Sequence, residues 1–99
     1  MNDSDITVVF HPDRWDRIVA SGQLPALRDW LRQNGLEPRY VDKAPITIDR
    51  QDGKAVIRYT AALRDAEGYR YRDPMTDGAA REERTVPLLV QPPVEFGEP

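Results

Sequence analysis

Arginine side chains give this 99-residue chain its clearest means of binding another molecule. A guanidinium group presents a planar fork of N–H donors that matches a carboxylate or a phosphate. Four arginines lie on two neighbouring predicted strands and would project from one face of a sheet: Arg58, Arg64, Arg70 and Arg72. The sequence therefore predicts a binding surface there. The alternative is a solvated face neutralised by Asp49, Glu82 and Glu83.

Two predicted helices joined by a short turn offer a second site, which would bind nucleic acid. The second helix carries side chains of the types that contact base edges in the major groove: Arg28, Arg32, Gln33 and Asn34. However, Asp29 lies among them, and a strand precedes the pair where a supporting helix is usual. The net charge of −3 also differs from the basic character of most nucleic-acid-binding domains. We therefore expect a protein partner or a second copy of the chain, with nucleic acid as the alternative.

Residues suited to catalysis are sparse. His11 is the one histidine, with Asp13 and Asp16 nearby, and no serine or threonine occupies a recognisable nucleophile setting. The chain has no cysteine, which excludes disulfides, thiolate metal sites and cysteine nucleophiles. No two glycines frame a phosphate-binding loop. We expect no enzyme activity, no cofactor and no metal site.

The arginines must be positioned by a central strand over residues 54–65, where apolar residues recur with a period of two. Asp52-Gly53 before it predicts a two-residue hairpin loop, which places Ile48 opposite Ile57. Gly68 after it suits the left-handed position of a three-residue loop. That second loop places Arg64 opposite Arg70 and Leu63 opposite Tyr71. Two facing arginines are unfavourable unless an anionic group lies nearby.

The remaining elements predict an α+β fold. A first strand over residues 5–11 would bury Ile6, Val8 and Phe10. Two helices follow, each opened by a proline and closed by a glycine, with Trp15, Trp30 and several leucines facing the core. Residues 79–84 could form one helical turn, and residues 85–91 predict a last strand at a sheet edge, because Pro87 removes a ladder donor. We expect the order β-α-α-β-β-β-β, with two short helices on one face of a mostly antiparallel sheet of four to five strands.

Composition is typical of one small globular domain. The hydrophobic content of 39% supports a single core, which we place in residues 1–91, followed by a flexible proline-containing tail over residues 92–99. No apolar run approaches the ~20 residues of a membrane span, and the N-terminal residues lack the pattern of a signal peptide. We therefore expect a cytoplasmic protein with no membrane partner.

Four segments carry a resemblance: VVFHPDRW, LPALRDWLRQNGL, VIRY and EERTVPL. Together they resemble small uncharacterised proteins of high-GC actinobacteria and their phages. The resemblance covers most of the chain, includes no motif of known chemistry, and implies no activity and no catalytic residues. It implies an accessory protein of a phage or mobile element. We therefore expect a non-enzymatic protein that acts through protein–protein interaction.

Overall fold

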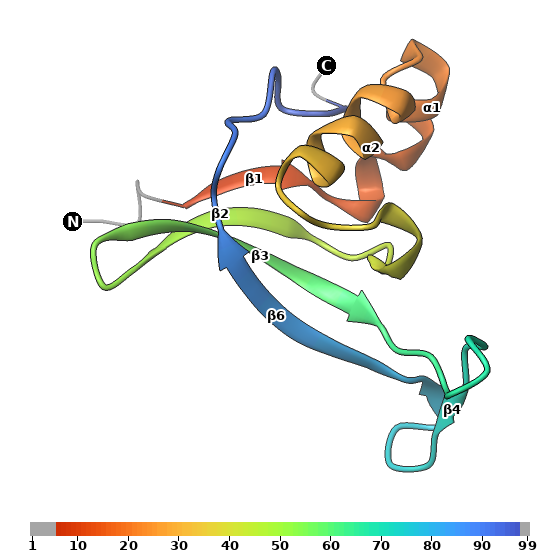
Figure 1. Cartoon of the computed structure of the whole chain (residues 1–99). Helices are drawn as coiled ribbons and strands as arrows, with labels where there is room; N and C mark the ends of the chain where they lie inside the picture. Colours follow the sequence, from red (N-terminus) through yellow and green to blue (C-terminus); the bar gives the residue numbers. More distant parts are fainter. Residues whose placement is uncertain (1–5, 98–99) are drawn as a thin grey trace.

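The computed structural model describes residues 6–97 and has the expected α+β architecture (Figure 1). Two helices lie over one face of a four-stranded antiparallel sheet whose strand order is β1-β2-β3-β6. A separate two-stranded sheet, β4-β5, lies at one end of the molecule. The bounds are β1 Thr7–Phe10, α1 Trp15–Ser21, α2 Leu24–Gln33, β2 Ile46–Gln51, β3 Lys54–Ala62, β4 Arg72–Asp73, β5 Gly78–Ala79 and β6 Arg81–Pro87, with 3-10 turns η2 Pro12–Arg14 and η3 Pro38–Tyr40.

The β2–β3 hairpin has the predicted turn and the predicted register. Asp52 and Gly53 both have positive φ, at 53° and 79°, as a type I′ turn requires. Ile48 pairs with Ile57, and Thr47 pairs with Arg58. The hairpin thus directs Ile48 and Ile57 to the same face of the sheet, towards the helices, and leaves the other face open.

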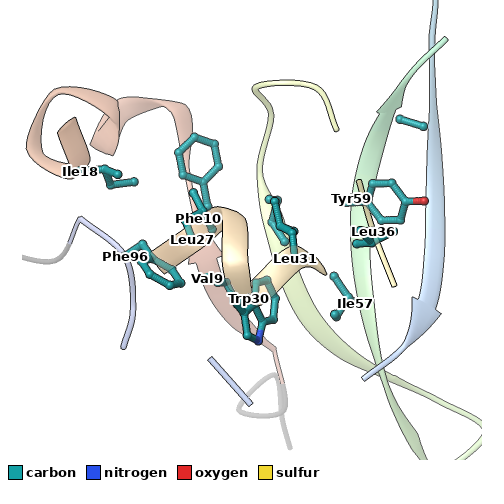
Figure 2. Close-up of a cluster of buried hydrophobic side chains, with 12 residues drawn as sticks. Val9, Phe10, Ile18, Leu27, Trp30, Leu31, Leu36, Ile57, Tyr59 and Phe96 are labelled. Atoms are coloured by element: carbon teal, nitrogen blue, oxygen red, sulfur yellow. The ribbon is translucent and has the colours of Figure 1, made fainter. Parts of the chain in front are cut away.

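Helix α2 contributes Trp30, the largest of the fully buried side chains, to the layer that covers the sheet. Trp30 and Leu31 are buried on its inner face (Figure 2). The helix ends in a Schellman motif, in which Gly35 has a φ of 83° and its N–H donates to the carbonyl of Arg32. The N–H of Leu36 donates to the carbonyl of Leu31, and this return of the chain buries the Leu36 side chain against Tyr59 of β3, as Figure 2 shows.

Phe96 and Gly97 are buried, which corrects the expectation of a flexible tail over residues 92–99 at these two positions. Phe96 is completely buried in the cluster that includes Val9 and Ile18 (Figure 2). Its N–H donates to the carbonyl of Val9, and Arg17 Nε donates to the carbonyl of Gly97 at 2.7 Å. A Cβ at Gly97 would lie 2.6 Å from Cβ of Arg14, so this segment packs tightly on α1. Residues 98–99 lie outside the described part of the chain.

Of the residues predicted to face the core from the first strand, Phe10 is buried as expected, whereas Val8 is only partly buried and Ile6 is not buried. The register shifts between Val8 and Phe10, as a β-bulge does, and Val9 is fully buried beside Phe10. Ile6 is exposed. An extra residue in one strand reverses the alternation beyond it, and a period-two reading of the sequence cannot locate that reversal.

The last strand begins earlier than predicted. Residues 79–84, expected as a helical turn, are extended, and β6 pairs with β3 from Arg81 opposite Ala62 to Pro87 opposite Val56. Both faces of its first half carry charged side chains, because no helix covers this part of the sheet. The apolar alternation that identifies a strand is therefore missing there.

Between β3 and β6 the chain leaves the main sheet as an arm, defined here as residues 63–80 (Figure 1). The predicted pairing of Arg64 with Arg70 is confirmed, and the N–H of Asp65 donates to the carbonyl of Tyr69 at 2.8 Å. The expected pair of Leu63 and Tyr71 is wrong, because Ala80 lies between them. Leu63 N–H donates to the Ala80 carbonyl, and Ala80 N–H donates to the Tyr71 carbonyl.

The arm projects beyond the helical layer. Figure 1 shows it at the ends of β3 and β6 that point away from α1 and α2. The radius of gyration, 14.3 Å, exceeds the roughly 13 Å expected for a compact domain of this length. None of residues 63–79 is buried. The arm therefore contributes surface and almost nothing to the hydrophobic core.

Candidate functional site

The tip of the arm consists of two loops that are held by carboxylate caps. Asp65 Oδ1 accepts hydrogen bonds from the N–H groups of Glu67 and Tyr69, at 3.0 and 2.9 Å. Asp73 Oδ1 accepts one from the N–H of Met75 at 2.8 Å, and the N–H of Asp77 donates to the carbonyl of Asp73. Aspartate side chains that bond to N–H groups further along the chain stabilise turns of this kind. The carboxylates of Asp65 and Asp73 thus fix the shape of the two loops.

Large apolar side chains project from these fixed loops. Met75 is 90% exposed, Tyr69 is 70% exposed, and Tyr71 is 43% exposed. Tyrosine and methionine are enriched in the cores of protein–protein interfaces. Sequence reasoning missed these residues, although the run YRYRDPM between two turn signals, in which aromatic and arginine residues alternate, is the signal that could have identified them.

Arg70 and Arg72, predicted binding residues, lie on the same arm and are paired with carboxylates. Arg72 Nη1 lies 2.8 Å from Asp77 Oδ1. Arg70 Nη1 lies 3.9 Å from Asp42 Oδ1, and Arg81 Nη1 lies 3.4 Å from the other oxygen of the same carboxylate. Arg72 thus has a close carboxylate of its own, whereas Arg70 shares the Asp42 carboxylate with Arg81.

Arg58 lies apart from the arm, at the centre of the open face of the sheet. Its guanidinium contacts Asp49 at 3.1 Å and Glu83 at 3.5 Å. The backbone N–H of Arg50 and the Arg58 side chain both donate to the Asp49 carboxylate, and they hold the pKa of Asp49 below its ordinary value. The neutralising role considered for Asp49 and Glu83 is thus realised around Arg58, whereas Glu82 pairs with Arg84 at 2.7 Å on the other face.

Arg64, the fourth predicted residue, turns away from Arg58 towards η3. Its guanidinium lies 5.3 Å from the centre of the Tyr40 ring, and Nη1 donates to the carbonyl of Gly68 at 2.8 Å. The four predicted arginines therefore do not form one array. Arg58 is in the sheet, Arg64 is at the base of the arm, and Arg70 and Arg72 are further along it.

A groove of about 430 Å³ opens beside Arg64, where strands β3 and β6 extend past the end of helix α2. Its lining includes the apolar residues Leu36, Val41, Tyr59, Ala61 and Leu63. Arg64 and Arg84 are the arginines among the lining residues, and Glu37 is the one carboxylate. The groove thus has an apolar floor, and its margin carries Arg64, Glu37 and an Arg84 side chain that pairs with Glu82.

The helix residues predicted as nucleic-acid contacts divide into two groups. Arg28, Arg32 and Gln33 are exposed, and Arg32 pairs with Asp29 at 3.4 Å. Asn34 is only 3% exposed, and its amide is fully occupied by the chain itself. The prediction that Asn34 contacts a base is therefore wrong for this structure, because both its donor and acceptor sides hold buried backbone groups.

His11 has a structural contact in this fold. Its Nδ1 accepts a hydrogen bond from the N–H of Asp13 at 3.1 Å and so caps the first turn of η2. Within residues 6–97, no group of three or more histidine or acidic side chains is placed to hold a metal ion. In the same residues, no helix has the length and apolar character needed to cross a membrane.

Comparisons with protein-family models, with curated proteins and with solved structures found no match to this chain.

Proposed function

We propose that this protein acts by binding another protein through the tip of its arm, as a non-enzymatic accessory component. The observation that carries the proposal is the exposure of Tyr69, Tyr71 and Met75 on two loops whose backbone is already fixed by Asp65 and Asp73. Side chains presented on an ordered backbone lose little conformational entropy on binding. Such a surface is suited to association with a partner.

The arrangement of charges favours a protein over a nucleic acid as the partner. Binding to a phosphate backbone depends on basic side chains that are free to replace counterions. Of the four predicted arginines, Arg58, Arg70 and Arg72 each have a carboxylate within 4 Å, and Arg64 donates to backbone carbonyls instead. Beside these paired charges the tip exposes Tyr69, Tyr71 and Met75, whose residue types are enriched in protein–protein interfaces.

Substituting Tyr69→Ser and Met75→Ser together should abolish partner binding and leave the fold intact. Both side chains are mostly exposed, so their loss removes interface contacts and no core contacts. If they are hot-spot residues, capture of the partner from a lysate of the producing cells should fall at least tenfold. Quantitative mass spectrometry of nuclease-treated lysates measures this, because nuclease removes proteins that are held only through nucleic acid.

The matched control is the double substitution Ile6→Ser and Val19→Ser, at residues that are 52% and 50% exposed and lie outside the arm. It should leave capture unchanged. Equal capture by the arm variant and the wild type, or equal loss in both double variants, would contradict the proposal.

A further inference from the structure

The groove at the base of the arm combines an apolar floor with the guanidinium group of Arg64 at its margin. Its floor is formed by side chains from three parts of the fold: Leu36 after helix α2, Val41 after η3, and Tyr59 with Ala61 on β3. Figure 2 shows Leu36 and Tyr59 at one edge of the buried cluster, with the Tyr59 hydroxyl directed towards the blue strand β6. This arrangement leaves apolar surface accessible where the helical layer ends.

Arg64 at the margin of the groove has no carboxylate partner among the described residues, whereas the other lining arginine, Arg84, pairs with Glu82. Arg64 donates to the carbonyls of Gly68 and Arg39, at 2.8 and 3.3 Å, and its Nε is buried without a hydrogen-bond partner. Arg39 donates to the hydroxyl of Tyr40 at 3.0 Å, and its guanidinium lies 5.0 Å from the centre of the same ring that Arg64 contacts. In the described residues, neither Arg64 nor Arg39 lies within 4 Å of a carboxylate oxygen. The hydrogen bond to Tyr40 raises the pKa of Arg39, and the charge of Glu37 contributes to the same shift.

This difference indicates where an external anion is favoured. An arginine that already pairs with a carboxylate gains little from a second one, whereas an unpaired guanidinium gains a charge-assisted hydrogen bond. Arg64 is already positioned by Tyr40 and by two carbonyl groups, so little side-chain entropy is lost when it binds. The site is therefore prepared for a carboxylate at its margin.

We propose that the groove binds a segment of a protein partner in which an apolar side chain is flanked by aspartate or glutamate. The apolar side chain occupies the floor at Leu36, Tyr59 and Ala61, and the carboxylate pairs with Arg64. The inference rests on the proposed protein-binding function and assigns to the groove a second contact, separate from the arm tip. A volume of about 430 Å³ is within the range of sites that bind small ligands and side chains.

A titration of the ¹⁵N-labelled protein with the blocked peptide Glu-Leu-Glu-Phe-Glu tests this directly. We expect saturable shifts at the backbone amides of Ala61, Leu63 and Arg64. The peptide Gln-Leu-Gln-Phe-Gln should bind at least fivefold more weakly, because the carboxylate contact is lost.

Arg64→Gln should weaken binding of the acidic peptide by a similar factor, whereas Arg50→Gln should not. Arg50 is a matched control because it is exposed and also donates to a backbone carbonyl, that of Gly53.

Three results would overturn the inference: no saturable shifts at the groove, equal binding of the acidic and neutral peptides, or equal loss in the Arg64 and Arg50 variants. Displacement of the acidic peptide by an oligothymidylate of eight nucleotides at equal concentration would also overturn it, in favour of a nucleic-acid site. The comparison of peptides uses the wild-type protein, so it holds even if Arg64→Gln disturbs the arm. The variant with Tyr69→Ser and Met75→Ser should still bind the peptide, which separates failure of the groove from failure of the tip.

Discussion

Replacing Asn34 with alanine should lower the free energy of unfolding by about 2–4 kcal/mol, a large share of the 5–15 kcal/mol typical of a single domain. The Asn34 amide connects the end of α2 to the C-terminal segment. Its Nδ2 donates to the carbonyls of Trp30 and Val90, and its Oδ1 accepts from the N–H groups of Leu89 and Val90 at 2.7 and 2.9 Å. Alanine leaves the N–H groups of Leu89 and Val90 without their acceptor, whereas the carbonyl of Val90 keeps its bond from Trp30.

Denaturant unfolding followed by tryptophan fluorescence measures the loss, since Trp30 is buried beside Asn34 and itself donates to the Val90 carbonyl. Hydrogen exchange provides a local readout, because the amides of Leu89 and Val90 should lose protection in the variant. Gln33→Ala, at the exposed neighbouring position, should change stability by no more than about 0.5 kcal/mol. Unchanged stability and unchanged exchange for Asn34→Ala would show that the amide does not hold the segment.

Replacing Phe96 with alanine should destabilise the fold by about 3–5 kcal/mol. Phe96 is completely buried between Val9 of β1 and Ile18 of α1, so its removal leaves a cavity in the main core. The effect should appear as a lower denaturation midpoint with little change in the slope of the transition.

Val94→Ala is the matched control for Phe96→Ala, because Val94 lies in the same segment and is exposed. It should shift stability by no more than about 0.5 kcal/mol. If the two variants were equally stable, the C-terminal segment would not be part of the core in solution.

The parts of the fold that follow from the sequence are those governed by local chemistry. Asp52-Gly53 determines the hairpin register, because two adjacent residues with positive φ leave few alternative turns. Gly22 and Gly35 end the two helices in the left-handed conformation, as the spacing of the apolar residues before them indicates. In each case the residues that specify the geometry are close together in the chain.

The parts that could not be predicted depend on contacts between distant segments. Phe96 is one apolar residue among prolines and glutamates, and nothing in its neighbourhood indicates that it reaches Val9 across most of the chain. Asn34 has the local pattern of a helix terminus, which it is, but its bonds to Leu89 and Val90 join residues more than fifty positions apart. Local patterns carry no information about such partners.

The candidate site was predicted only in part for the same reason. Arg64 and Arg70 were expected to face each other and do so. The expectation of one arginine face was not met, because the chain leaves the main sheet after Ala62 and because Arg64 turns onto Tyr40. An arginine has a carboxylate partner only where Asp42, Asp49 or Asp77 lies beside it in the folded structure. The sequence does not show where these three aspartates lie.

The most direct test of protein binding through the arm is site-specific photo-crosslinking in the producing cells. A benzophenone amino acid replaces Tyr69 at the exposed tip in one experiment, and Val19 on helix α1 in the other. We predict a covalent adduct with a protein, either a partner or a second copy of the chain, from position 69 only, and we predict that it survives nuclease treatment. Equal adducts from both positions, or an adduct at position 69 with nucleic acid alone, would contradict this account.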